Sequence, residues 1–374
     1  MPYIKKLPVS IFIILLWVFV ALALCLIVPT IQGTYDYQYS NTILGIFRRA
    51  LVCIFLALLV RNVTYTDEVI EEFMLYYVCA NTLYVISTII FILFPSLRSF
   101  WVSILHLNQK SQNLLLSYGY AGRFGWSGFS GFRNTIDCTL SIVFCTYLYA
   151  GVKSKKKLST FQYVLLALFC FIGNMFYGRT GVLVSSACLL FGLTMYRKLR
   201  FKLIIQVLFV VLFAIVFIAY FRGHIEAVDQ WYRWVSAPFI NLIRTGSFKN
   251  SSADRLFNEM IFMPEAKTFL FGDARYVDPA TGLYYMHTDA GFMRQILFWG
   301  VILTTVMYVV WLFSIMCMKR DMVFKLMCLV MCIIFEIKGE TYYELLPLFA
   351  IIAAIDKTSK HSGKIPNRMV LSDV

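Results

Sequence analysis

The sequence lacks any CxxC pair and any Cys/His cluster with the spacing of metal ligands, and it contains only four histidines. A structural zinc site is therefore not expected. Ten cysteines are present, but each lies in or beside an apolar run, where a free thiol packs as a small hydrophobic group. We expect neither a metal nor a cofactor. These cysteines are Cys25, Cys53, Cys79, Cys138, Cys145, Cys170, Cys188, Cys317, Cys328 and Cys332.

Charge is also scarce, because Asp, Glu, Lys and Arg make up 14% of the 374 residues, whereas 60% are hydrophobic and 17% are aromatic. A soluble globular domain has about half apolar residues, so this composition predicts an all-α polytopic membrane protein. Apolar runs such as 11–28, 164–176 and 203–220 approach or reach the roughly 20 residues that cross about 30 Å of hydrocarbon. No small-residue cleavage site follows the first run, so we expect residues 8–29 to be an anchor.

The apolar runs predict ten membrane-spanning helices, with two long polar segments at 95–133 and 222–289. With ten spans, every short lysine-rich loop falls on one face, which the positive-inside rule makes cytoplasmic. Both termini are then cytoplasmic, and residues 1–374 form one membrane domain whose two long segments build an outer cap. The predicted spans are 8–30, 43–60, 69–94, 134–151, 159–177, 181–196, 203–221, 290–318, 323–337 and 341–355.

Arginine is distributed differently from lysine. Most lysines fall in the predicted cytoplasmic loops, whereas most arginines fall on the outer face or at the adjoining helix ends. Because guanidinium grips phosphate and carboxylate with two parallel hydrogen bonds, this distribution indicates an anionic ligand outside. The outer arginines are Arg48, Arg49, Arg98, Arg123, Arg133, Arg179, Arg222, Arg233, Arg244, Arg255, Arg275 and Arg294.

The first candidate cluster is the glycine-rich stretch GYAGRFGWSGFSGFRN at 119–134. Its glycines allow a freely bending loop, and Trp126 offers a flat face on which a sugar ring can stack, while Arg123 and Arg133 add positive charge. The same composition suits a plain loop at the membrane interface, and the sequence leaves both interpretations open.

The second cluster is the short turn YGRTG at 177–181, between two apolar runs. A charge at the edge of the hydrocarbon costs up to a few kcal/mol unless it has a partner or water, which makes Arg179 a functional candidate. The alternative is that its side chain extends to lipid phosphate.

The third cluster opens the eighth span with HTDAGFMRQILFWG at 287–300. Asp289 could take part in chemistry or could simply cap the helix N-terminus, where carboxylates are stabilised. Arg294 lies further into the span and is harder to explain as a cap. His287 could act as a base, although a loop histidine can equally be solvated.

The fourth cluster is the turn FEIKGETYYE at 335–344, between the last two predicted spans. Lys338 and Glu340 are candidates for substrate contact and for chemistry. Glu336 and Lys338 could instead simply pair with each other.

The four clusters converge on one layer at the outer membrane surface. Such a layer suits an anionic lipid-linked substrate, because several arginines can hold a pyrophosphate and stabilise the charge that develops as it leaves. A carboxylate could deprotonate an attacking sugar hydroxyl.

Three of these motifs, YGRTG, TDAGFMRQILFWG and EIKGETYY, together with the long loop before the second, resemble the O-antigen and capsule repeat-unit polymerases of the Wzy type. The resemblance covers mainly residues 115–345. It implies a multi-pass glycosyltransferase of the bacterial inner membrane, with a GT-C-like bundle and a site facing the periplasm. Such an enzyme serves lipopolysaccharide or capsule synthesis by transferring a growing glycan from undecaprenyl pyrophosphate to a newly arrived lipid-linked repeat unit.

The resemblance also implies roles for individual residues. Pyrophosphate and glycan contacts are expected from Arg179, Arg294, Arg123, Arg133, Lys338 and Trp126. The candidates for the base, or for positioning the acceptor, are Asp289, His287 and Glu340. The implied partners are the undecaprenyl-pyrophosphate-linked donor and acceptor, membrane lipids and a chain-length regulator, with no nucleic acid.

Two alternatives stay open. An O-antigen ligase uses the same donor, but ligases typically have a His-Ser-Asn step where this chain has His-Thr-Asp-Ala-Gly, which favours a polymerase. A polysaccharide flippase or exporter should line its path with charge at the bilayer midplane, whereas the predicted spans are largely free of charge at that depth.

Overall fold

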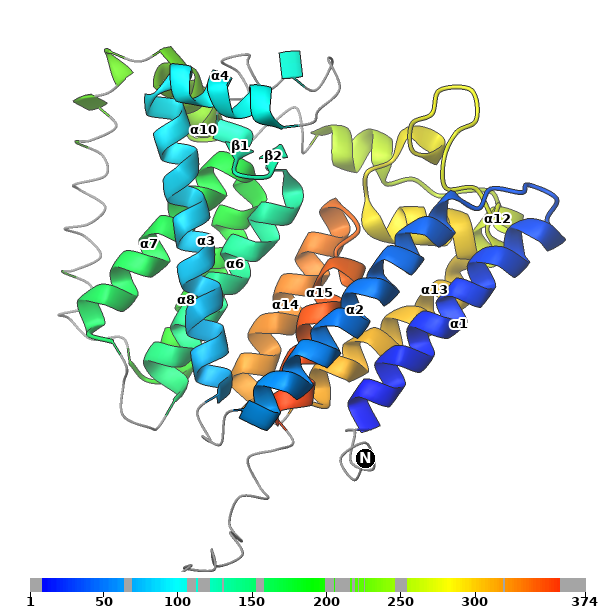
Figure 1. Ribbon diagram of the computed structural model, residues 1–374. Helices are drawn as coiled ribbons and strands as arrows, with labels where there is room; N and C mark the ends of the chain where they lie inside the picture. Colours follow the sequence, from blue (N-terminus) through cyan, green and yellow to red (C-terminus); the bar gives the residue numbers. More distant parts are fainter. Residues whose placement is uncertain are drawn as a thin grey trace, which may run out of the picture.

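The computed structural model describes residues 9–63, 69–105, 112–113, 122–129, 131–152, 158–198, 222–224, 226–245, 254–318 and 320–356, with a few single positions between 205 and 220. Within these residues the fold is that of an all-α membrane protein with one two-stranded hairpin (Figure 1). Most of the seventh predicted span, 203–221, lies outside the described residues, as do the loop 153–157 and the tail from 357.

Long helices form a bundle, and shorter elements lie at its end. The bundle contains α1 (Val9–Ile31), α2 (Gln38–Val63), α3 (Val69–Leu93), α6 (Phe132–Thr146) with its π-helical extension η3 (Tyr147–Gly151), α7 (Thr160–Tyr177), α8 (Arg179–Met195), α13 (Gly291–Met316), α14 (Met322–Lys338) and α15 (Tyr342–Asp356). The shorter elements are α4 (Pro95–Ile104), β1 (Phe124–Gly125), β2 (Gly128–Phe129), α10 (Glu226–Thr245), η4 (Leu256–Met260), α12 (Ala266–Phe271) and η5 (Tyr285–His287).

The shorter elements gather at one end of the bundle, which we call the hairpin end because it carries the antiparallel β1–β2 pair (Figure 1). The turns from α7 to α8 and from α14 to α15 lie at the same end, and the N-terminus lies at the other. The two long polar segments of the sequence, as far as they are described, therefore lie at the same end of the bundle. Part of the segment 222–289 is helical in α10, where Asp229 accepts hydrogen bonds of 2.7 Å from both Arg222 and Arg233.

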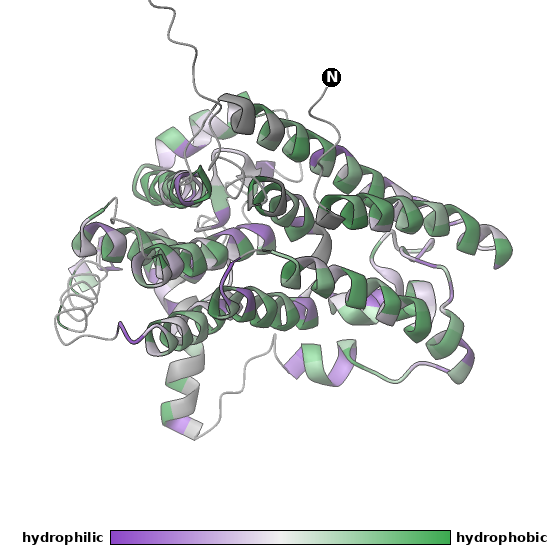
Figure 2. Cartoon of the chain, turned by 90° about the horizontal axis from the view of Figure 1, so that it is seen from below, coloured by the Kyte–Doolittle hydropathy of each residue, from purple (hydrophilic) through white to green (hydrophobic). Residues whose placement is uncertain are grey.

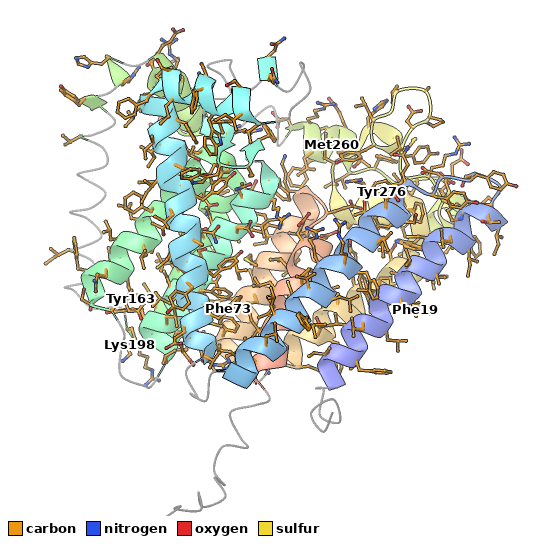
Figure 3. All side chains as sticks on the ribbon, viewed as in Figure 1. Phe19, Phe73, Tyr163, Lys198, Met260 and Tyr276 are labelled. Carbon is orange, nitrogen blue, oxygen red and sulfur yellow. The ribbon has the colours of Figure 1, made fainter. Side chains whose placement is uncertain are left out.

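The surface of the bundle is apolar. Figure 2 shows the long helices coloured as hydrophobic over most of their length, and Phe19 on α1, which is 65% exposed, lies at the periphery in Figure 3. In water such a surface would be an extensive apolar patch, whereas hydrocarbon covers it at no cost. Among the described residues, five helical stretches are long and apolar enough to cross a membrane: Ile11–Ile31, Gln38–Ala57, Val69–Leu93, Thr160–Tyr177 and Gly291–Met316.

The other predicted spans that lie within the described residues coincide with shorter helices. The α8 helix is apolar but has 17 residues, and α14 and α15 have 17 and 15. Helix α6 has 15 residues and continues into the five residues of η3. The number of crossings and the side on which each terminus lies stay predictions.

A buried polar cluster joins α6, α7 and α8 beneath the Gly178 turn. The Asn174 side-chain amide donates to Ser185 Oγ at 2.7 Å and to Thr139 Oγ1 at 3.2 Å. Hydrogen bonds between helices hold them together where hydrocarbon supplies no hydrophobic force. A Cβ at Gly178 would lie 2.7 Å from Thr135 Oγ1, so only glycine permits this close approach. The cluster and the turn fix the start of α8, and therefore Arg179.

Helix α13 is kinked at Gly300, whose φ of 77° is left-handed and favours glycine. A Cβ at Gly300 would lie 2.2 Å from the carbonyl oxygen of Leu270, so α12 packs directly on the kink. The backbone N–H of Asp273 donates to the carbonyl of Leu297 at 2.7 Å. These contacts fix the first half of α13 against the segment that follows α12.

Candidate functional site

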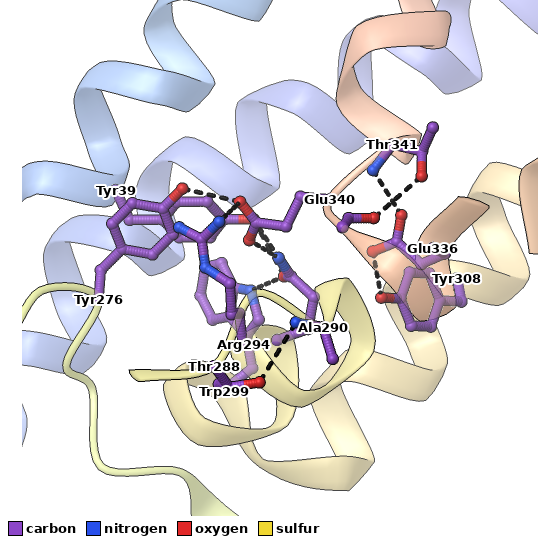
Figure 4. Close-up of polar contacts among 12 residues, drawn as sticks. Tyr39, Tyr276, Thr288, Ala290, Arg294, Trp299, Tyr308, Glu336, Glu340 and Thr341 are labelled. Atoms are coloured by element: carbon purple, nitrogen blue, oxygen red, sulfur yellow. Dashed lines mark hydrogen bonds and ion pairs between the residues drawn. The ribbon is translucent and has the colours of Figure 1, made fainter. Parts of the chain in front are cut away.

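A buried ion pair joins α13 to the turn between α14 and α15 (Figure 4). Arg294 Nη1 lies 2.9 Å from Glu340 Oε2, and the two side chains are only 5% and 1% exposed. The Glu340 carboxylate also accepts hydrogen bonds from the Tyr276 hydroxyl at 2.7 Å and from Gln295 Nε2 at 2.5 Å. A buried carboxylate with this set of donors is held firmly in place.

Aromatic rings enclose the ion pair. The Arg294 guanidinium carbon lies 4.4 Å from the ring centre of Tyr276 and 3.5 Å from that of Tyr284. Tyr39 stacks on Tyr276 with ring centres 4.4 Å apart, and its hydroxyl accepts from Gln295 Nε2 at 2.7 Å. The network therefore connects α2, α13, the 276–284 loop and the turn at Glu340.

A second carboxylate fixes the same turn. Glu336 accepts a hydrogen bond of 2.6 Å from the backbone N–H of Thr341 and one of 2.7 Å from the Tyr308 hydroxyl (Figure 4). A Cβ at Gly291 would lie 2.5 Å from the carbonyl oxygen of Gly339 and 2.6 Å from Glu336 Oε1. The start of α13 thus lies directly against the end of α14, which brings the third and fourth sequence clusters together.

The residue that begins α13 is not Asp289. The N-cap is Ala290, and it has no side-chain cap hydrogen bond. Thr288 acts locally instead: its hydroxyl donates to the Met260 carbonyl at 2.8 Å and accepts from the Ala290 N–H at 3.2 Å. The capping interpretation of Asp289 is therefore wrong, and its exposed carboxylate is left for another role.

Three cations from three sequence clusters influence one another at the hairpin end. Burial lowers the pKa of Lys338 at the end of α14; the Arg179 cation lowers it further, whereas the carboxylate of Asp289 opposes the shift. The pKa of Arg179 is also lowered, first by burial and then by the Arg123 cation. We call Arg123, Arg179 and Lys338 the cation cluster. Like charges held together at a partly buried site are a common sign of an anion-binding function.

Arg133 is paired with two carboxylates. Its guanidinium lies 3.5 Å from Glu344 and 3.9 Å from Asp137, and its side chain is 59% exposed. Glu344 also pairs with Arg49 at 2.8 Å, while Asp137 accepts a 2.7 Å hydrogen bond from the Tyr77 hydroxyl.

Trp126 and His287 are exposed at the hairpin end. Trp126 lies at the tip of the β1–β2 hairpin, edge-on to Trp101 with ring centres 5.4 Å apart. The Trp101 indole N–H donates to the Trp126 carbonyl at 2.9 Å, so the hairpin is fixed to α4. His287 lies in the loop before α13, two residues from Asp289.

Sequence patterns did not single out the aromatic and amide residues of the network around the ion pair. These are Tyr39, Tyr276, Tyr284, Gln295 and Trp299. The polar Gln295 inside an apolar run was the one available signal, because a buried amide needs partners.

Among the described residues, no group of three or more His, Cys, Asp or Glu side chains could hold a metal ion. The ten cysteines are free thiols, and most are buried. Comparisons of the chain with protein-family models, with curated proteins and with solved structures gave no match.

Proposed function

We propose that this protein is a glycosyltransferase that polymerises undecaprenyl-pyrophosphate-linked oligosaccharide repeat units. The observation that carries the proposal is the cation cluster of Arg123, Arg179 and Lys338, next to the exposed carboxylate of Asp289. Arg179 and Lys338 come from two of the motifs that resemble the Wzy-type polymerases, and Arg123 comes from the glycine-rich stretch at 119–134.

The electrostatics of the cluster favour a pyrophosphate ligand. Each cation raises the free energy of charging its neighbour, and burial adds to this cost. An anion bound between them removes the repulsion and makes charge-assisted hydrogen bonds. The same cations would stabilise the charge that develops on the pyrophosphate as it departs.

The proposed reaction is a displacement at the anomeric carbon of the donor sugar. A hydroxyl of the acceptor repeat unit attacks this carbon, the bond from the carbon to the pyrophosphate oxygen breaks, and undecaprenyl pyrophosphate leaves with the electron pair. The hydroxyl proton passes to the carboxylate of Asp289. Asp289 suits this role better than Glu340 does, because Asp289 is exposed whereas the Glu340 oxygens are occupied by Arg294, Tyr276 and Gln295.

Arg294 and Glu340 act in this proposal as a support for the site. Their ion pair holds the 276–284 loop and the turn next to Lys338, so it positions the reacting groups without touching the substrate. Arg133 lies at the rim, neutralised by Glu344 and Asp137. The hairpin end would face the periplasm of a bacterial inner membrane, with both termini in the cytoplasm.

Disrupting the gene in its host tests the function. A strain without a polymerase should still carry single repeat units on its surface lipid or on the outward-facing carrier, because translocation continues. Repeat units confined to the inner face would support an exporter and refute the proposal. Full-length polymer that accumulates on the carrier but not on the surface lipid would indicate a ligase.

An Asp289→Asn variant tests the base. We expect polymer synthesis to fall by about 10²–10⁴-fold at unchanged membrane abundance, because the amide cannot accept the proton. Glu259→Gln is the matched control, since Glu259 is an exposed carboxylate at the same end that pairs only weakly with Arg255 at 3.3 Å. Equal polymer from both variants would remove Asp289 from the chemistry.

A further inference from the structure

The loop that precedes α13 is anchored at its base. The Asp36 carboxylate accepts hydrogen bonds from the backbone N–H groups of Tyr276 at 2.7 Å and Val277 at 3.0 Å. Val277 and Tyr284 form an antiparallel bridge, and the Asp278 N–H donates to the Leu283 carbonyl at 2.8 Å. These bonds therefore hold the backbone of the loop, and with it the positions of its outer residues.

Tyr284 offers an aromatic face held from behind. The Arg294 guanidinium lies against one side of its ring, at 3.5 Å from the centre, and the residue is still 43% exposed. Arg294 is fixed in turn by Glu340. A ring held in this way loses little conformational entropy when a ligand stacks on it, which favours binding.

His287 is bonded through its backbone to Tyr284 and has a strained conformation. Its backbone N–H donates to the Tyr284 carbonyl at 2.9 Å, and both Met286 and His287 have left-handed φ angles, 55° and 54°. Neither residue is a glycine or an asparagine, so each such conformation costs roughly 1–3 kcal/mol and tends to occur at functional sites. The His287 residue is exposed.

We propose that Tyr284 and His287 form a subsite for an uncharged sugar ring, which takes the pyranose of the acceptor repeat unit. This inference rests on the proposed function and adds the acceptor side of the same site. The C–H face of a pyranose stacks on the Tyr284 ring, and a ring nitrogen of His287 bonds a sugar hydroxyl. Asp289 follows His287 by two residues, so a hydroxyl of the bound sugar lies next to the proposed base.

A tyrosine that only anchors the loop at the membrane interface would require neither a ring held by Arg294 nor strained neighbours. An interfacial anchor needs an exposed ring at headgroup depth, but it does not need a following histidine with a left-handed backbone conformation. The strain at Met286 and His287 therefore favours a ligand of defined shape.

The test uses the full chain in lipid nanodiscs and oligosaccharide fragments released by mild acid from the surface polysaccharide of the host. Binding is followed by saturation-transfer NMR, with no lipid or phosphate on the probe. We expect Tyr284→Leu to weaken binding about tenfold, because the leucine still covers Arg294 but has no flat face, and Tyr284→Phe to retain it. Leu283→Ser is the matched control, since Leu283 is an exposed neighbour in the same loop, at 59% against 43% for Tyr284.

A His287→Gly variant separates function from folding. Glycine adopts a positive φ without strain, so the melting temperature should stay the same or rise while the affinity for the oligosaccharide falls. If Tyr284→Leu does not insert into the membrane, the His287→Gly variant alone tests the subsite. Wild-type affinity in both Tyr284→Leu and His287→Gly, or equal weakening in Leu283→Ser, would overturn the subsite.

Failure of the subsite can be distinguished from failure of the proposed function. If gene disruption stops polymer synthesis while Tyr284→Leu makes polymer of normal length, the function stands and the subsite is wrong. If polymer continues after disruption, the polymerase proposal itself is wrong, whatever the oligosaccharide binds.

Discussion

Replacing Glu340 by glutamine removes the negative charge of the buried ion pair and leaves the Arg294 cation in place. The two side chains are 5% and 1% exposed, so solvent screens the pair very little. Removing one partner of such a pair typically costs about 3–5 kcal/mol, because the remaining charge is buried without compensation. The Tyr276 hydroxyl and Gln295 amide lose a charged acceptor at the same time. We therefore expect Glu340→Gln to unfold at clearly lower denaturant or temperature than the wild type.

The double variant Arg294→Met, Glu340→Leu gives the matched comparison. It removes both charges and keeps similar side-chain volumes, which is often neutral or stabilising for a buried pair. Unfolding of both proteins is measured by tryptophan fluorescence in one detergent. If Glu340→Gln is as stable as the wild type, the assigned ion pair is refuted.

Polymer length in cells then separates support from substrate contact. If Arg294 only supports the loop, the double variant should regain much of the polymer that Glu340→Gln loses. If the double variant is as stable as the wild type but makes no polymer, Arg294 contacts the pyrophosphate, as the sequence alone suggested.

Three further predictions address the charge layout. Arg179→Lys should shorten or abolish the polymer and lower the rate of polymerisation by about ten- to a hundred-fold, because lysine lacks the planar fork of arginine. Arg133→Lys should have a mild effect on chain length, because Arg133 is already paired with Glu344. Gels of chain length, read beside the membrane abundance of each variant, compare the two. The lowered pKa of Lys338 means that its charge is lost at a lower pH than in the unfolded chain, so the affinity for the donor should fall as pH rises through that lowered value toward 10.5. The Lys338→Arg variant should keep its affinity across this range. If the pH profiles of KM for the wild type and for Lys338→Arg coincide, the assignment of Lys338 to donor binding is contradicted. Reporter fusions at Gly125 and Lys155 should read periplasmic and cytoplasmic respectively, and a shared side would overturn the topology.

Hydropathy predicted the helices well because the period and length of an apolar run are local properties. The runs at 8–30, 69–94 and 290–318 correspond closely to α1, α3 and α13. The kink at Gly300 was not predicted, because a glycine inside an apolar run is compatible with a straight helix until a neighbour such as α12 packs on it. The number of crossings rests on short helices, such as α8 and α15, for which length alone does not decide.

Sequence reasoning brought four clusters into one layer but could not tell which charges in that layer neutralise one another. Depth along the bundle follows from position in a span, whereas pairing follows from the rotation of each helix, and successive residues differ by about 100° around the axis. Arg294 and Arg179 looked alike in sequence, each at the outer end of an apolar helix. Rotation turns Arg294 toward Glu340 and two tyrosine rings, while Arg179 starts its helix close to Arg123 and Lys338. A negatively charged substrate is attracted to cations that lie close enough to lower one another's pKa, so the Gly178 turn, which fixes Arg179, is where donor binding should be most sensitive to change.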